Sequence, residues 1–337
     1  MKNEELKNKK KTFVYLYYAL YNRLDEVITQ VDGICLSFGK IINNNGLFEV
    51  DVKHLIPIID DLKRMDDTPN LILSIGGWGA DGFSRAVEDD AKRSHFISSI
   101  INVLDEFHFS GVDIDWEYPT TSSGGINSNG EVDKHRFTLL LKEIKEQFES
   151  KNKKYTLSIA CSMSPKFYEV KEINNYIDYL NLMSYDLDYG TNINVHLTSP
   201  HHSSNTLMDL ETGVKAFIES GISSEKIIVG CAMYARKCKT KNITTGISNE
   251  HTEFNTIKYS DMENLIKSGK VTVLFDYVAM AEYAIDIEYF YSFDSVKSIN
   301  EKVKFVKQNN LGGIMAWEYN QDSKEHVLLK EMLKVGD

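Results

Sequence analysis

Short apolar runs alternate along the chain with longer stretches in which apolar residues recur every three or four positions. The short runs are typical of buried strands, and the longer stretches have the period of helices that pack on them. The pattern predicts eight strands, at 13–18, 33–39, 71–75, 109–119, 155–161, 177–183, 226–233 and 312–317. It predicts helices at 52–62, 96–107, 137–148, 207–219, 296–308 and 324–333.

Eight buried strands that alternate with helices predict a parallel sheet closed on itself, a (β/α)8 TIM barrel of the α/β class. We expect residues 12–236 and 293–337 to form this barrel. Residues 237–292, between the seventh and eighth strands, include the strand-like runs 271–275 and 289–291. They are predicted to form a small α+β insertion domain, and residues 1–11 a charged N-terminal tail.

The fourth predicted strand carries three carboxylates. Asp113, Asp115 and Glu117 occupy alternate positions and therefore share one face, whereas apolar residues occupy the other. Because like charges about 7 Å apart repel, we expect at least one of these acids to have a raised pKa. A carboxylic acid that stays protonated beside ionised carboxylates can act as a general acid. A solvated acidic face on an edge strand is the alternative, which the central position of the strand disfavours.

Composition excludes several classes of protein. Of the 337 residues, 42% are hydrophobic, which excludes general disorder, and the net charge of −11 argues against a nucleic-acid partner. No apolar run reaches the about 18 residues that a membrane span needs. The four cysteines lie far apart without CxxC spacing, so we expect buried free thiols and no zinc site. We expect no metal and no cofactor.

In a (β/α)8 enzyme, residues at the C-terminal ends of the strands build the active site. Unusual residues stand at several of these ends here: Gly76, Gly77, Trp78, Met183, Tyr185, Asp186, Tyr234, Arg236 and Trp317. Trp116 falls on the apolar face of its strand, which favours packing. The position of Trp317 alone favours neither a core role nor a sugar-stacking role.

Several segments together resemble the motifs of glycoside hydrolase family 18, the chitinase family. In the signature Asp-x-x-Asp-x-Asp-x-Glu, the four defined positions are Ser110, Asp113, Asp115 and Glu117, so three of the four match. The other similar segments are Ser74-Ile75-Gly76-Gly77, Met183-Ser184-Tyr185-Asp186, Tyr234-Ala235-Arg236 and Gly312-Gly313-Ile314-Met315-Ala316-Trp317. The resemblance covers about residues 13–333.

This resemblance implies a role for each matching residue. Glu117 would be the general acid and base, Asp115 would orient the substrate's acetamido group, and Asp113 would share a proton with Asp115. Tyr185 would hold the acetamido carbonyl, which replaces a second carboxylate as the nucleophile. Trp317 would stack under the sugar whose bond breaks. The remaining implied substrate-binding residues are Tyr17, Phe38, Gly76, Gly77, Trp78, Tyr118, Met183, Asp186, Tyr234 and Arg236.

The resemblance implies a glycosidase that cleaves β-1,4 bonds in chitin or other N-acetylglucosamine oligomers. The alternatives are an endo-β-N-acetylglucosaminidase acting on peptidoglycan or N-glycan cores, and a non-catalytic chitinase-like carbohydrate-binding protein. The chain departs from the family at Ser110 and at Ala235, where glycine is usual. We expect a monomer with no membrane partner. Such a substrate favours secretion, although the charged segment from Lys2 to Lys11 lacks the apolar region that is typical of a signal peptide.

Overall fold

A computed structural model describes residues 9–187, 209–240 and 251–337 of the chain. In these residues one sheet has the strand order β1-β14-β8-β7-β6-β5-β4-β2-β3, and β1 also pairs with β2, so the sheet closes on itself. The barrel strands are β1 (Lys11–Tyr17), β2 (Gly33–Asn44), β4 (Asn70–Gly76), β5 (Gly111–Asp115), β6 (Thr156–Cys161), β7 (Tyr179–Leu182), β8 (Ile227–Ala232) and β14 (Gly313–Trp317). The predicted (β/α)8 barrel is therefore confirmed.

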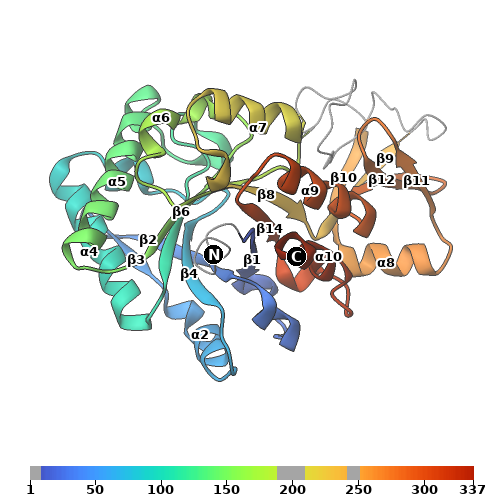
Figure 1. The fold of residues 1–337 in the computed structure, drawn as a ribbon. Helices are drawn as coiled ribbons and strands as arrows, with labels where there is room; N and C mark the ends of the chain where they lie inside the picture. Colours follow the sequence, from blue (N-terminus) through green and yellow to red (C-terminus); the bar gives the residue numbers. More distant parts are fainter. Residues whose placement is uncertain (1–8, 188–208, 241–250) are drawn as a thin grey trace. The chain divides into compact units, whose positions relative to one another are not determined.

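Helices follow most of the barrel strands, as the periodicity predicts (Figure 1). They are α2 (Ile56–Lys63), α3 (Phe83–Ala86), α4 (Asp90–Phe107), α5 (Glu131–Ser150), α6 (Val170–Ile173), α7 (Leu210–Glu219), α9 (Val296–Gln308) and α10 (Val327–Leu333). After β1 the chain forms only short 3-10 helices, at Tyr18–Leu20 and Glu26–Gln30. The first residues of the helix predicted at 207–219 lie outside the described residues.

Helix α4 delivers the chain to the acidic strand. The side chain of Asp89 accepts a hydrogen bond from the Lys92 amide at 2.8 Å and so caps the helix N-terminus. At the other end, His108 adopts a left-handed conformation and stops the helix directly before β5. The periodicity predicted a start near residue 96 because the first turns of α4 are mostly polar.

A β-hairpin that the apolar pattern did not predict extends β2. Strand β3 (Leu47–Asp51) pairs antiparallel with the end of β2, and Asn44 stands opposite Leu47. The two turn residues, Asn45 and Gly46, both have positive φ. Asn-Gly with two positive φ angles is the preferred two-residue hairpin turn, so the sequence did carry a signal for it.

Residues 234–293 contain a second, five-stranded sheet with the order β10-β9-β13-β12-β11. Its strands are β9 (Tyr234–Thr240), β10 (His251–Lys258), β11 (Thr272–Asp276), β12 (Ala281–Ile285) and β13 (Tyr289–Phe293), and α8 (Tyr259–Lys267) lies beside them (Figure 1). The boundaries given above for barrel, insertion and tail stay a prediction.

The chain divides into two compact units. One comprises Tyr15–Leu182 with Ala216–Ile227, and the other comprises Met1–Val14, Met183–Lys215 and Ile228–Asp337. In the second unit, the ammonium group of Lys302 donates to a carboxylate oxygen of Asp294 and to the carbonyl of Gly230, each at 2.8 Å. Both charged side chains are fully buried, and the hydrogen bond from Lys302 to Gly230 links α9 to β8 from inside the core.

The cysteines and the lengths of the helices were also considered in the sequence. All four cysteines are buried free thiols, as predicted. Among the described helices, none combines the length and the apolar character that a bilayer crossing requires.

Candidate active site

Asp113 lies at the centre of a buried hydrogen-bond network inside the sheet. One carboxylate oxygen accepts from the hydroxyls of Tyr15 at 2.9 Å and Ser74 at 2.8 Å. The other accepts from Ser158 at 2.7 Å and from the amide of Asn181 at 3.1 Å. Burial raises the pKa of Asp113, and these hydrogen bonds oppose the increase. Four donors fill the acceptor positions of this carboxylate, which holds it in one orientation.

Asp115 has the opposite environment two residues further along β5. It is buried, yet its Oδ1 atom has no hydrogen-bond partner among the described residues. Burial first, and then the charges of Glu117 and Asp113, raise the pKa of Asp115 well above its usual range. The expectation that one acid of this face has a raised pKa is confirmed, but burial is a larger cause than the repulsion from which it was predicted.

Glu117 lies beyond the end of β5, which stops at Asp115, and its side chain is half-buried. A carboxyl group in this position can reach a bound molecule and exchange protons with it. The pair therefore combines an accessible acid with a buried neighbour whose pKa is raised, and two carboxyl groups in such different environments are typical of general acid–base catalysis.

The glycines at the end of β4 let the chain pass close to this pair. A side chain at Gly76, which has a φ of 115°, would overlap the backbone carbonyl of Asp115. The amide of Gly77 donates to that same carbonyl at 2.9 Å. A Cβ atom on Gly77 would come within 2.6 Å of the Phe38 ring, so glycine is required at both positions.

Aromatic side chains surround these glycines. The rings of Tyr17 and Phe38 lie 5.8 Å apart, and Trp78 exposes 65% of its surface, unusually high for tryptophan. Trp116 is instead buried and stacks on Phe83 at 5.2 Å, which confirms the predicted packing role. An exposed indole beside an acidic strand end provides a surface on which a sugar ring can stack.

A second cluster, in the other compact unit, is centred on Asp186. Its carboxylate accepts from the Tyr234 hydroxyl at 3.0 Å and from Arg236, which binds both carboxylate oxygens. The Tyr185 ring packs edge-on against Tyr234 with 6.2 Å between centroids. Two-point binding by arginine fixes both the position and the plane of a carboxylate, so Asp186 is held rigidly beside Tyr185.

The remaining predicted residues of this unit also lie at strand ends. The buried hydroxyl of Ser184 exchanges hydrogen bonds with the backbone of Gly230, which directs the flanking Met183 and Tyr185 to the other face. Trp317 ends β14 and is half-buried, and its carbonyl accepts from the Met233 amide at 2.8 Å.

Comparison with known protein families shows to which family the chain belongs. The model of the family described as glycosyl hydrolases family 18 matches residues 7–322. The chain belongs to glycosyl hydrolase family 18.

Individual relatives agree with this family. The chain is 30% identical over 299 residues to chitinase A1 of Niallia circulans, which is 78% of this chain and 42% of that protein. It is 28% identical over 350 residues to endochitinase 1 of Metarhizium robertsii, which is 91% of this chain and 79% of that protein. The chain thus spans less than half the length of the first of these relatives.

A solved structure of similar sequence has the same fold. It is a family 18 N-acetylglucosaminidase from Paenibacillus barengoltzii, with a TM-score of 0.85 and 29% identity. The similarity covers 97% of this chain and 99% of that one.

Two residues, Ser110 and Ala235, depart from the family motifs. Ser110 lies at the base of β5, where its backbone pairs with Leu71 at 2.7 Å and Thr156 at 2.9 Å. Ala235 is fully buried within β9, so its methyl group does not face an open cleft.

The four partners of Asp113 were missing from the residues predicted to form the site: Tyr15, Ser74, Ser158 and Asn181. The strand period could have identified two of them. Tyr15 shares a face of β1 with the predicted Tyr17, and Asn181 stands two positions before Met183 in the strand predicted at 177–183. Polar residues on the inward face of an apolar strand need partners inside the barrel, and Asp113 is the charged group there.

Proposed function

We propose that this family 18 protein hydrolyses β-1,4-linked N-acetylglucosamine polymers or oligomers, the class of substrate to which chitin belongs. The different burial of the two neighbouring acids, Asp115 and Glu117, supports the proposal most directly. Asp115 is a buried acid with an unpartnered oxygen among the described residues, and Glu117 is a half-buried acid just beyond it. The relatives named as chitinases, at about 30% identity, support the choice of substrate.

In the proposed mechanism, Glu117 donates its proton to the glycosidic oxygen as the bond from that oxygen to the anomeric carbon breaks. The substrate's own acetamido oxygen attacks the anomeric carbon and forms a cyclic oxazolinium ion. Asp115 passes its proton to Asp113 and then, as a carboxylate, accepts a hydrogen bond from the acetamido N–H through its unpartnered oxygen and stabilises the positive charge. Glu117 then deprotonates a water molecule, which attacks the anomeric carbon and opens the ring. Two inversions leave the product in the β configuration.

Asp113 and Tyr185 complete the proposed machinery. Because four donors enclose the carboxylate of Asp113, it is unsuited to attack carbon and instead shares a proton with Asp115. The proposal assigns the hydroxyl of Tyr185 to the acetamido carbonyl, and assigns Asp186 to hold Tyr185 in place through Tyr234. Trp317 would bind the face of the sugar whose bond breaks.

A chitotriose with a fluorogenic leaving group tests the proposal. We expect the wild-type protein to release the fluorophore. The Glu117→Gln variant should release it at a rate lower by a factor of about 10²–10⁴ or more, because an amide cannot donate the proton. Proton NMR should show the β anomer first. A Glu117→Gln variant with over about a tenth of wild-type turnover, or initial release of the α anomer, would exclude this mechanism.

The rival functions give different results in the same assay. A carbohydrate-binding protein without catalysis would bind the oligomer and release no fluorophore. An enzyme specific for N-glycan cores would leave chitotriose intact and cleave a core glycopeptide. The presence of Glu117 at the position of the family's catalytic glutamate favours an enzyme.

A further inference from the structure

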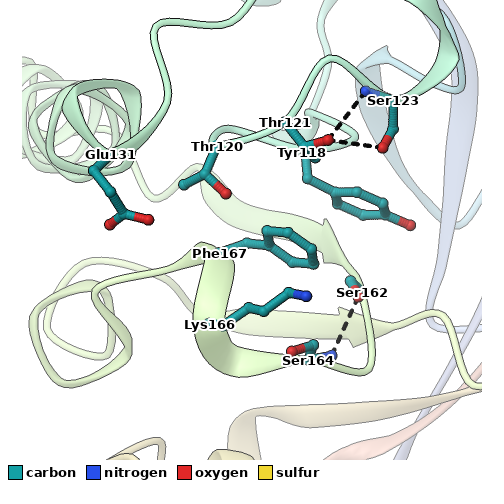
Figure 2. Close-up of a pocket in the computed structure, with 9 residues that line it drawn as sticks. All are labelled: Tyr118, Thr120, Thr121, Ser123, Glu131, Ser162, Ser164, Lys166 and Phe167. Carbon is teal, nitrogen blue, oxygen red and sulfur yellow. Dashed lines mark hydrogen bonds between the residues drawn. The ribbon is translucent and has the colours of Figure 1, made fainter.

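A polar cleft of about 650 Å³ adjoins the catalytic strand, within the first compact unit. Its volume is typical of a site for a small molecule or a sugar residue. Figure 2 shows its walls, formed by the loop after β5, the start of α5 and the segment after β6. The lining residues are Tyr118, Thr120, Thr121, Ser123, Glu131, Ser162, Ser164, Lys166 and Phe167.

The cleft adjoins the proposed catalytic acid through Tyr118. This residue follows Glu117 in the chain, and burial together with the charge of Glu117 raises the pKa of its phenol. The Tyr118 ring stacks on Phe167 with 5.0 Å between centroids and 13° between planes. The two rings therefore form a fixed wall of the cleft, beginning at the residue that follows Glu117.

Lys166 supplies a positive charge at this wall. Its ammonium nitrogen lies 4.8 Å from the centre of the Phe167 ring, and Figure 2 shows it beneath that ring. Among the residues that the structure describes, no carboxylate lies within ion-pair distance of this nitrogen. The contact with the aromatic face restrains the lysine, so its remaining hydrogen-bond donors are available to a molecule in the cleft.

Two hydroxyl groups extend this set of available donors. The side chains of Thr120 and Ser164 line the cleft and have no hydrogen-bond partner in the described part of the chain. The one acid of the lining, Glu131, exposes 81% of its side chain and pairs with Lys134 at 3.7 Å. Glu131 thus lies on the rim, with its charge partly neutralised, and the other charged residue of the lining is Lys166.

We propose that this cleft is a subsite for a sugar residue that carries a carboxylate, bound by Lys166 with the hydroxyls of Thr120 and Ser164. The inference rests on the proposed function and narrows it. The protein would prefer β-1,4-linked N-acetylglucosamine chains in which an adjacent sugar is acidic over chains that are entirely neutral. An ammonium group and two hydroxyls match the acceptors of a carboxylate, and charge-assisted hydrogen bonds are stronger than neutral ones.

The test measures binding, so it does not depend on turnover. Calorimetry on the Glu117→Gln variant compares a tetrasaccharide that carries a lactyl carboxylate on alternate N-acetylglucosamine units with its methyl ester. We expect the acid to bind about tenfold more tightly, the factor that corresponds to about 1.4 kcal/mol. A third ligand carries the carboxylate as a uronic acid and shows which source of the charge the cleft accepts.

Second substitutions, added to the Glu117→Gln variant, show which residue causes the preference for the acid over its ester. Adding Lys166→Gln should reduce the ratio of the two dissociation constants to about one, and adding Lys166→Arg should preserve most of it. Lys142→Gln is the matched control, since it removes an equal charge from the exposed surface of α5. A ratio near one in the Glu117→Gln parent, or a ratio that Lys166→Gln leaves unchanged, would overturn the subsite. Failure of the wild-type protein to cleave chitotriose would count against the proposed function alone.

Discussion

Replacing Asp115 with asparagine should stabilise the protein at neutral pH while it removes activity. The substitution keeps the size and shape of the side chain and removes its charge. In the folded protein this carboxyl group is buried, and one of its oxygens has no hydrogen-bond partner among the described residues. Burying a charge without full pairing costs more than burying a neutral group of the same shape, so we expect the free energy of unfolding at pH 7 to rise by about 1–3 kcal/mol.

The pH dependence gives the sign of this effect independently. Because the pKa of Asp115 is raised in the folded state, the folded protein retains a proton that the unfolded chain releases above about 3.9. Stability therefore falls as pH rises from the unfolded pKa through the folded pKa. The amide that replaces the carboxyl group does not titrate, so the advantage of Asp115→Asn over wild type should be largest at pH 7–8 and shrink as pH falls toward about 4.

Asp113→Asn is a matched control on the same strand. The carboxylate of Asp113 accepts four hydrogen bonds, two on each oxygen. An amide nitrogen accepts none, so donors on one side must turn away, and we expect a loss of about 1–3 kcal/mol. Both variants are measured by urea unfolding between pH 5 and 8, with hydrolysis of the fluorogenic substrate alongside. Equal destabilisation of the two variants at pH 7, or a difference independent of pH, would refute this account of the two acids.

Two further substitutions test the second unit. Trp317→Ala should weaken oligosaccharide binding with little change in the unfolding midpoint, whereas unchanged affinity with a loss of about 3–5 kcal/mol would make Trp317 a core residue. Lys302→Met leaves the buried carboxylate of Asp294 without its cation and should cost about 3–5 kcal/mol of unfolding free energy. Lys304→Met, which removes an exposed lysine from the same helix, should change it by less than about 0.5 kcal/mol; equal losses in the two lysine variants would contradict the importance of the buried pair.

The barrel could be predicted from the sequence because its signal is repeated. Each strand is a short apolar run, and each long helix carries an apolar stripe, so errors at single boundaries do not alter the architecture. The hairpin of β2 and β3 was missed because its signal is local. It depends on the pair Asn45-Gly46, and the flanking residues lack the sustained apolar run by which the other strands were recognised.

The candidate site was predictable where residues adjoin in sequence and not where they meet only in space. Asp113, Asp115 and Glu117 were found together because a strand places alternate residues on one face. Tyr15 and Asn181 approach Asp113 from strands 98 and 68 positions away. Each is a single polar residue in an apolar run. The stacking of Phe167 on Tyr118 likewise depends on tertiary structure, and no motif in the sequence indicates it.

Depth along one strand gives three chemically similar carboxyl groups different environments. Asp113 is deepest, and four donors from neighbouring strands orient it. Asp115 follows, still buried but with one oxygen unpartnered among the described residues, so its neutral form is favoured. Glu117 lies past the strand end, where a substrate can reach it. The strand period fixes the order of the three acids along the chain, the neighbouring strands supply the partners that separate the first from the second, and the proposed mechanism uses each environment for a different task.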